Sequence, residues 1–443
     1  MGSSDHANKA SRRYVSYRSA HRSRSHESAH ADEAASTSGK MLDHPSVPQG
    51  LASLVTTDDE LADLIDHLRS VGRFGYDSEF IGELTYVPKL CLVQVASPER
   101  VVLVDPLAEL DLDPFWELIA DPSIEKVVHA GQQDLEPIVR HLGRAPANIF
   151  DTQIAAGFIG LPYPLSLSKL VIETAGVKIG KGLTFTHWDQ RPLSAMQLRY
   201  AADDVRYLLL ARERIGEQLD ALHHTQWATE ECAAQCDPKL FTFNPEHQYL
   251  RVRGAGSLPP RNLAVLRALT AWRDAAARES DVPPRAFLKD EILIELARNP
   301  VKSVEKLDRV RGLPRPVEAE HGSNLVALTI EALSLPEPAL PVTKDTEQTP
   351  IEKFRTDSLW GVAQCLCSGQ SIDVAAATNR QEINDFYQLL TAHPNGDTPH
   401  RLLTGWRREA LGETLSQLVD GKAQIELTWP EGALRTVRSD PAG

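Results

Sequence analysis

Residues 72–80 read GRFGYDSEF and place two carboxylates, Asp77 and Glu79, at the end of an apolar run. The run predicts a β-strand, and residues two apart in a strand project from the same face. Adjacent anions repel each other unless a cation lies between them, so the pair favours a divalent-metal site. The alternative is a solvent-exposed strand end at which water screens both charges, and D-x-E alone is too common to exclude it.

The surrounding sequence predicts a mixed α/β domain over residues 50–235. Strand-like runs bounded by turn residues lie at 73–80, 89–97, 100–106 and 126–130. An amphipathic helix with a TTDD cap is expected within residues 51–70, and the longest helix is expected at 194–219. Neighbouring strands followed by alternating helices and strands predict a mixed sheet with helices on its faces.

Composition divides the rest of the chain. The predicted segments are a disordered basic tail (1–45), an irregular connector (236–256), a helical domain (257–337), a Pro-rich linker (338–354) and a C-terminal helical region (355–443). The C-terminal region is expected to end in a short hairpin within residues 425–438.

The net charge of −14 is unevenly distributed. Residues 41–249 carry −15, from 16 basic and 31 acidic side chains, whereas residues 250–332 carry +3, from 14 basic and 11 acidic side chains. An acidic module that binds divalent cations beside a basic module that touches phosphate has this pattern. The candidate phosphate contacts are Arg261, Arg267, Arg273, Arg278, Lys289 and Arg298, and the alternative is an ordinary charged helical surface.

Several protein classes are excluded. No apolar run approaches the roughly 20 residues that span a bilayer. The five cysteines lack zinc-site spacing, which predicts reduced thiols in a cytoplasmic protein. The stretch GVKIGKG hints at a phosphate-binding loop, but the spacing of Gly176 and Gly180 fails the ATP-binding pattern. We therefore expect no membrane helix and no ATP site.

Three further residues strengthen the metal-site interpretation. Asp134 follows the strand at 126–130, near the start of a helix, although a helix N-terminus alone also favours a carboxylate. Tyr200 and Asp204 are four apart and share one helix face. Asp204 borders apolar neighbours, whereas Asp203 lies near Arg199 and Arg206; we predict that Asp204 faces inward and Asp203 outward.

Four such carboxylates can surround two Mg²⁺ or Mn²⁺ ions about 4 Å apart, an arrangement suited to phosphodiester hydrolysis. One ion would activate a water and the other would stabilise the leaving 3′ oxygen. Tyr200 is a poor base, because its ordinary pKa lies near 10, but it is placed to orient the attacking water.

Residues 55–215 resemble the DEDD superfamily of 3′–5′ exonucleases, in the branch with a tyrosine in its third motif, and within it the ribonuclease D family. The matching stretches are DSEF (77–80), KVVHAGQQDLEPI (126–138) and KGLTFTHWDQRPLSAMQLRYAADDVRYLL (181–209). The resemblance implies a ribonuclease H-like α/β fold. It makes Asp77, Glu79, Asp134 and Asp204 the metal ligands and Tyr200 the water-positioning residue.

The helical segment 259–335 resembles an HRDC domain, carried by LRALTAWRDAAARESDVPP and ELARNPVKSVEKLDRVRGLP. RLLTGWRREALGETL (401–415) resembles the end of the ribonuclease D C-terminal region, while SLWGVAQCLCSGQSIDVAAATNRQEI matches it only loosely. The C-terminal region is therefore HRDC-like, and the resemblance leaves a complete second bundle open.

These features predict a metal-dependent 3′–5′ exoribonuclease that releases 5′-mononucleotides, with tRNA 3′ processing implied by the resemblance. The alternatives are a 3′–5′ DNA exonuclease and a catalytically inactive RNA-binding scaffold; the scaffold is opposed by the presence of all four acids and the tyrosine. Lys181 is a candidate phosphate contact, and Trp188 a candidate for stacking on a base or for packing. His129 is expected to be a hydrogen-bonded core histidine.

Overall fold

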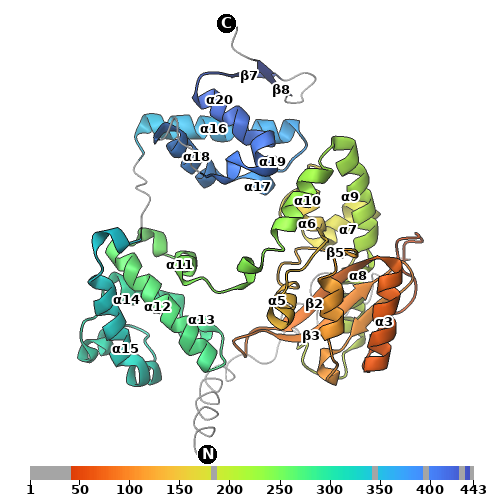
Figure 1. Ribbon diagram of the computed structural model, residues 1–443, viewed down its shortest axis with the longest axis horizontal. Coiled ribbons are helices and arrows are strands. Elements are labelled where there is room, and N and C mark those ends of the chain that lie inside the picture. Colours follow the sequence, from red (N-terminus) through yellow and green to blue (C-terminus); the bar gives the residue numbers. More distant parts are fainter. Residues whose placement is uncertain (1–40, 181–186, 342–347, 393–398, 429–434, 440–443) are drawn as a thin grey trace, which may run out of the picture. The chain divides into compact units, whose positions relative to one another are not determined.

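The computed structural model describes residues 41–180, 187–341, 348–392, 399–428 and 435–439. These residues form two compact units (Figure 1). The first unit contains residues 41–79, 91–241 and 348–439, within the described ranges, and the second contains residues 80–90 and 242–341. Of the helices in the described part of the chain, none combines the length and apolar character that a membrane crossing requires.

The first unit is built on a mixed six-stranded sheet. Its strands are β1 (Ser53–Val55), β2 (Arg73–Ile81), β3 (Lys89–Ala96), β4 (Val101–Val104), β5 (Glu125–Val128) and β6 (Ile149–Asp151). Their order is β1-β4-β3-β2-β5-β6. The β1–β4, β2–β5 and β5–β6 pairs are parallel, and β3–β4 is antiparallel. The predicted mixed sheet is confirmed, but SLV forms strand β1 although it lies within the segment 51–70 that the sequence predicts to be helical.

The helices of this sheet domain are α3 (Asp58–Val71), α4 (Asp113–Ile119), α5 (Glu136–Leu142), α6 (Thr152–Gly157), α7 (Leu167–Ala175), α8 (Ala195–Arg206), α9 (Leu208–Leu222) and α10 (Thr225–Ala234). The predicted TTDD cap is confirmed: Thr57 and Glu60 form a capping box at α3, which then buries Leu61, Leu64 and Leu68. Helix α8 packs on β4, α9 on β5 and α10 on β6.

The single long helix predicted at 194–219 is wrong. The chain breaks at Tyr207, which is buried in a small cluster with Val47, Val171 and Leu210. No glycine or proline lies at this break, so the sequence carries no local signal for it. Tertiary packing of Tyr207 accompanies the interruption between α8 and α9.

The second unit is a helical bundle. Its main helices are α12 (Pro260–Glu279), α13 (Pro284–Phe287), α14 (Asp290–Arg298) and α15 (Arg315–Leu333), with a short helix η5 (Val304–Arg309). Helix α12 packs against α14 and α15 (Figure 1) and buries Leu266, Leu269 and Trp272 in the bundle core. The connector was predicted to be irregular, yet it forms the short helices η2 (Pro238–Phe241), α11 (Pro245–Gln248), η3 (Tyr249–Arg251) and η4 (Ala255–Ser257).

Residues 80–90, which join β2 to β3, belong to this second unit. The Tyr86 hydroxyl donates to Asp274 Oδ1 at 2.8 Å, and the Arg278 guanidinium lies 5.0 Å from the Tyr86 ring centroid. The strand connector is thus held by helix α12 through one aromatic side chain.

The C-terminal region belongs to the first unit. Its elements are α16 (Pro350–Gly369), α17 (Val374–Ala377), α18 (Arg380–Ala392), η7 (Arg401–Leu403), α19 (Gly405–Arg407), a π-helical turn (Arg408–Gly412), α20 (Glu413–Val419), and the antiparallel strands β7 (Gln424–Thr428) and β8 (Arg435–Ser439). The terminal hairpin is confirmed. Helix α16 starts inside the predicted linker, because Thr349 and Glu352 form a capping box there.

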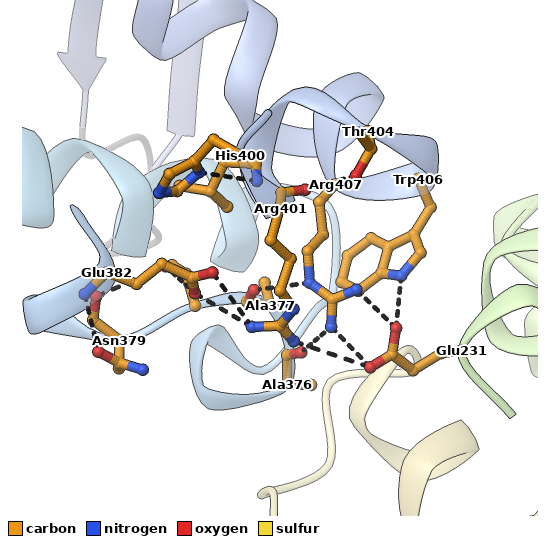
Figure 2. A network of polar contacts seen from close by, with 12 residues as sticks. Glu231, Ala376, Ala377, Asn379, Glu382, His400, Arg401, Thr404, Trp406 and Arg407 are labelled. Atoms are coloured by element: carbon orange, nitrogen blue, oxygen red, sulfur yellow. Dashed lines mark hydrogen bonds and ion pairs between the residues drawn. The ribbon is translucent and has the colours of Figure 1, made fainter. Parts of the chain in front are cut away.

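A buried polar network joins the C-terminal region to α10 (Figure 2). Glu231 accepts hydrogen bonds from Arg407 Nη1 and Nη2, both at 2.6 Å, and from Trp406 Nε1 at 2.9 Å. Arg407 also donates to the carbonyls of Ala376 and Ala377. The Trp406 ring packs edge-to-face on Phe158, with centroids 4.6 Å apart. Such bidentate pairs are strong and directional, so they define how this region meets α10.

We expect Arg407→Ala to destabilise the first unit by about 3–5 kcal/mol, because it leaves the carboxylate of Glu231 without its bidentate partner in a largely buried site. Urea unfolding followed by circular dichroism measures the loss. The matched control is Arg408→Ala, since the neighbouring Arg408 is exposed. Equal effects of the two substitutions would contradict a specific role for the pair.

Candidate active site

Strand β2 carries the first two carboxylates. Phe74 and Tyr76 are fully buried and anchor the strand in the centre of the sheet, between β3 and β5. Asp77 and Glu79 follow, both partly exposed. Strand β2 pairs with β5 through Arg73–Gly75, so the strand is held in the sheet just before the two carboxylates.

The third carboxylate, Asp134, lies in the turn between β5 and α5. Because β5 is parallel to β2, this turn lies beside the second half of β2. Tyr76 Oη donates to the Asp134 carbonyl at 2.7 Å, and Ser78 Oγ donates to Asp134 Oδ1. Sequence reasoning missed both residues: strand alternation shows that they face away from Asp77 and Glu79, but not what they face.

The turn that carries Asp134 is itself held from β6. The backbone N–H groups of Ala130 and Gly131 donate to Asp151 Oδ1 and Oδ2 at 3.0 and 3.1 Å. A Cβ at Gly131 would lie 2.6 Å from Val128 Cβ, so the turn requires glycine. The preceding His129 hydrogen-bonds Thr152 Oγ1 and the Leu165 carbonyl through its two ring nitrogens, which confirms its interpretation as a core histidine.

Helix α8 supplies Tyr200 and Asp204. A capping box of Ser194 and Gln197 starts the helix. Gly75 of β2 allows the α8–α9 backbone to come close, because a Cβ there would lie only 3.1 Å from the Val205 carbonyl oxygen. The Tyr200 hydroxyl hydrogen-bonds the Asp204 carboxylate. Asp204 is only 8% exposed, as the sequence predicted for the inward-facing acid.

The neighbouring Asp203 faces the two arginines expected from the sequence. Its carboxylate oxygens lie 4.0 Å from Arg199 Nε and 3.6 Å from Arg206 Nε. Asp203 therefore pairs with two arginines of its own helix, whereas the partner of the Asp204 carboxylate is the Tyr200 hydroxyl. The same residue type has two environments one position apart.

The four carboxylates lie within one another's electric field. Burial raises the pKa of Asp77 well above its usual range, and the charges of Asp134, Asp204 and Glu79 raise it further. Burial, with the charges of Asp204 and Asp134, raises the pKa of Glu79 to about 8. Burial also raises the pKa values of Asp134 and Asp204 to about 7 each. The structure thus brings together all four acids predicted from separate parts of the sequence.

These side chains fit a hard divalent cation by their chemistry. They offer only carboxylate oxygens, the ligands that Mg²⁺ prefers. Asp204 Oδ2 is buried without a hydrogen-bond partner among the described residues, which is unusual for a buried acceptor. Within the described ranges, no three His, Cys, Asp or Glu side chains already have the geometry of a formed metal site. Ser78 and Tyr200 instead occupy oxygens of Asp134 and Asp204.

The remaining candidates have different positions. Lys181 lies outside the described residues. Trp188 is 4% exposed, and its ring centroid lies 6.1 Å from that of Tyr200, so packing is favoured over stacking on a base. The structure corrects the expectation that Arg273 is a surface phosphate contact. It is 7% exposed and donates to the Leu288 carbonyl and to Asp290 Oδ1 at 2.9 and 2.7 Å.

Comparison with known proteins agrees with this architecture. The family described as 3′–5′ exonuclease matches residues 52–220, and the HRDC domain family matches residues 262–329. Ribonuclease D of Gluconacetobacter diazotrophicus is 36% identical over 371 residues, which cover 83% of this chain and 93% of the relative. Ribonuclease D of Escherichia coli is 33% identical over 371 residues, covering 83% and 98%. The crystal structure of E. coli RNase D matches with a TM-score of 0.72 at 32% identity, covering 84% and 99%.

The mixed sheet, the grouped carboxylates and the helical HRDC domain define the class, a ribonuclease H-like 3′–5′ exonuclease of the DEDD type. The chain belongs to the ribonuclease D family and is a 3′–5′ exoribonuclease. Exonucleases of this kind generally depend on divalent metal ions.

The raised carboxylate pKa values predict how metal and pH act on stability. A carboxyl whose pKa is raised in the folded state stabilises the fold at pH values below about 4, its pKa in the unfolded chain. This stabilisation is lost as the pH rises toward about 8, the folded-state pKa of Glu79. Cations need the deprotonated carboxylates, so we expect Mg²⁺ or Mn²⁺ to raise Tm more at pH 8 than at pH 5. At a metal concentration about 100 times Kd, binding should raise the free energy of unfolding by about 2.7 kcal/mol.

Thermal unfolding in EDTA and in metal, at both pH values, measures this difference. Asp204→Asn should reduce the metal-induced rise, whereas Asp203→Asn should keep it, since Asp203 is paired with arginines. If the metal-induced rise in Tm depended neither on pH nor on the Asp204 substitution, the cations would bind at a site other than the four carboxylates.

Proposed function

We propose that this chain hydrolyses RNA from its 3′ end with two divalent metal ions, Mg²⁺ or Mn²⁺, held by Asp77, Glu79, Asp134 and Asp204. The observation that carries the proposal is that the charges of Asp134, Asp204 and Glu79 raise the pKa of Asp77, and those of Asp204 and Asp134 raise the pKa of Glu79, which supports a site where the four carboxylates lie close together. When bound, the cations would lower the pKa of the attacking water and stabilise charge on the phosphate and on the leaving 3′ oxygen.

Tyr200 would orient the attacking water. Burial and the charges of Asp204, Glu79 and Asp77 raise the pKa of its hydroxyl, so the hydroxyl stays protonated at physiological pH. It can therefore donate and accept hydrogen bonds but does not serve as the base. Ser78 and Tyr76 would act on the same reaction by fixing the side chain and backbone of Asp134.

The substrate we propose is 3′-extended structured RNA, with tRNA precursors as the example, trimmed to release 5′-mononucleotides. Support comes from E. coli RNase D, whose structure is described as that of an exoribonuclease involved in structured RNA processing. We place this activity in the cytoplasm, consistent with five cysteines, all described, that form no disulfide. The bundle at 257–337 would hold RNA weakly through its surface charge.

The C-terminal region at 355–443 is proposed to be an HRDC-like bundle attached to the nuclease domain. This proposal is supported by the Trp406-Arg407 pair, which has the same two residue types as Trp272-Arg273 of the first bundle. In both pairs the arginine is buried and bound to a carboxylate, Glu231 in one and Asp290 in the other.

Asp204→Asn tests the proposed metal site. Removing one charged ligand should cost several kcal/mol of transition-state stabilisation, which corresponds to a fall in kcat of about 10³-fold. Degradation of 3′-labelled RNA in Mn²⁺ and in Mg²⁺, with the products sized, measures the effect. The same substitution one residue earlier, Asp203→Asn, is the matched control and should stay within about threefold of the parent. Parental activity in Asp204→Asn would make the assignment wrong.

Sugar preference separates the proposed activity from DNA exonuclease activity. Matched RNA and DNA oligomers with identical sequence and 3′ label are compared at equal metal concentration. We expect RNA to be degraded at least about tenfold faster, because one or more hydrogen bonds to the 2′-hydroxyl are worth about 1.4 kcal/mol or more. Equal rates would favour the DNA exonuclease alternative.

A further inference from the structure

The segment that leads into α8 is tied to the sheet by one arginine. Arg191 Nε and Nη2 donate to the two carboxylate oxygens of Asp105, at 2.5 and 2.6 Å. Nη2 also donates to the Cys91 carbonyl at 2.7 Å, and Nη1 donates to the carbonyls of Trp188 and Gln190 at 2.7 and 2.9 Å. All five N–H groups of the guanidinium are therefore used.

The partners of Arg191 belong to the rigid part of the nuclease sheet. Asp105 directly follows β4, is 5% exposed, and donates its own backbone N–H to the Val55 carbonyl of β1 at 3.0 Å. Cys91 lies within β3. The guanidinium thus connects β3 and the end of β4 to the backbone of residues 188–190.

The backbone held in this way presents Trp188 to the proposed water-positioning residue. Trp188 is buried, and its ring packs against the Tyr200 ring with centroids 6.1 Å apart and planes tilted by 38°. Tyr200 in turn hydrogen-bonds Asp204. A continuous set of contacts therefore runs from the sheet through Arg191 and Trp188 to Tyr200.

We propose that Arg191 is a positioning residue for hydrolysis: it fixes the backbone of Trp188, whose ring then holds Tyr200 in its working orientation. The inference rests on the proposed role of Tyr200 in orienting water. This role requires an arginine, because its planar guanidinium donates hydrogen bonds to one carboxylate and three carbonyls at the same time. A lysine has one ammonium and cannot reproduce that geometry.

The test is a double-mutant cycle on 3′-labelled RNA in saturating Mn²⁺, with kcat and KM measured separately. Tyr200→Phe removes the proposed water contact but keeps the ring that packs on Trp188. Arg191→Lys should lower kcat by about 10- to 100-fold with little change in KM, because small displacements near the reacting atoms are costly. In the Tyr200→Phe background the same substitution should lower kcat by less than about twofold, since its route of action is already lost.

Arg212→Lys is the matched control. Arg212 is also a partly buried arginine paired to a carboxylate, with Nε 3.0 Å from Glu125 Oε1 and 22% of its side chain exposed, against 25% for Arg191. Arg212 touches neither Trp188 nor Tyr200 in any contact of the described residues, so its substitution should leave kcat within about threefold of the parent. If circular dichroism shows that Arg191→Lys does not fold, Asp105→Asn replaces it in the cycle. That substitution weakens the same ion pair by removing the charge of the carboxylate.

Each outcome decides the proposal. A loss of kcat that largely disappears in the Tyr200→Phe background supports it. Equal losses in both backgrounds, or no loss in either, overturn it, because Arg191 would then act independently of the tyrosine. Full activity of Tyr200→Phe alone would refute the tyrosine's role and this inference with it, whereas the metal site would still be judged separately by Asp204→Asn.

Discussion

Repulsion among buried carboxylates is the constraint on which the nuclease domain depends. Burial raises the pKa values of Asp77, Glu79, Asp134 and Asp204, and for Asp77 and Glu79 the charges of the other site carboxylates raise the pKa further. Folding alone offers two ways to relieve this repulsion, protonation and hydrogen bonding from Ser78 and Tyr200. A divalent cation bound at the proposed site would offer a third, because it would leave the carboxylates ionised.

Close backbone approach makes this crowding possible. Gly75 lets the helix pair α8–α9 come onto β2, and Gly131 lets the turn after β5 fold back on Val128. Asp151 then holds that turn by two backbone hydrogen bonds. The functional side chains are thus carried by backbone that is fixed from several directions, which limits how far their mutual repulsion can push them apart.

Three arginines of the described residues are engaged within the chain's own structure. Each donates hydrogen bonds to a carboxylate and to at least one backbone carbonyl; they are Arg191, Arg273 and Arg407. A guanidinium engaged in this way is not available to phosphate. The basic charge counted along residues 250–332 therefore overstates the surface that RNA can meet, and the weak net charge of the bundle is consistent with modest, sequence-independent binding.

The sequence by itself determined the main strands, the α3 cap, the inward face of Asp204 and the four carboxylates of the proposed site. These follow from side-chain period and residue chemistry, which are properties of one element at a time. Only the tertiary structure decided that Ser78 and Tyr76 hold Asp134, that the helix is interrupted at Tyr207, that SLV adds strand β1, and that Arg273 is buried. Each of these depends on a contact between segments distant along the chain. A local pattern states the direction in which a side chain points, but not what the folded chain brings to meet it.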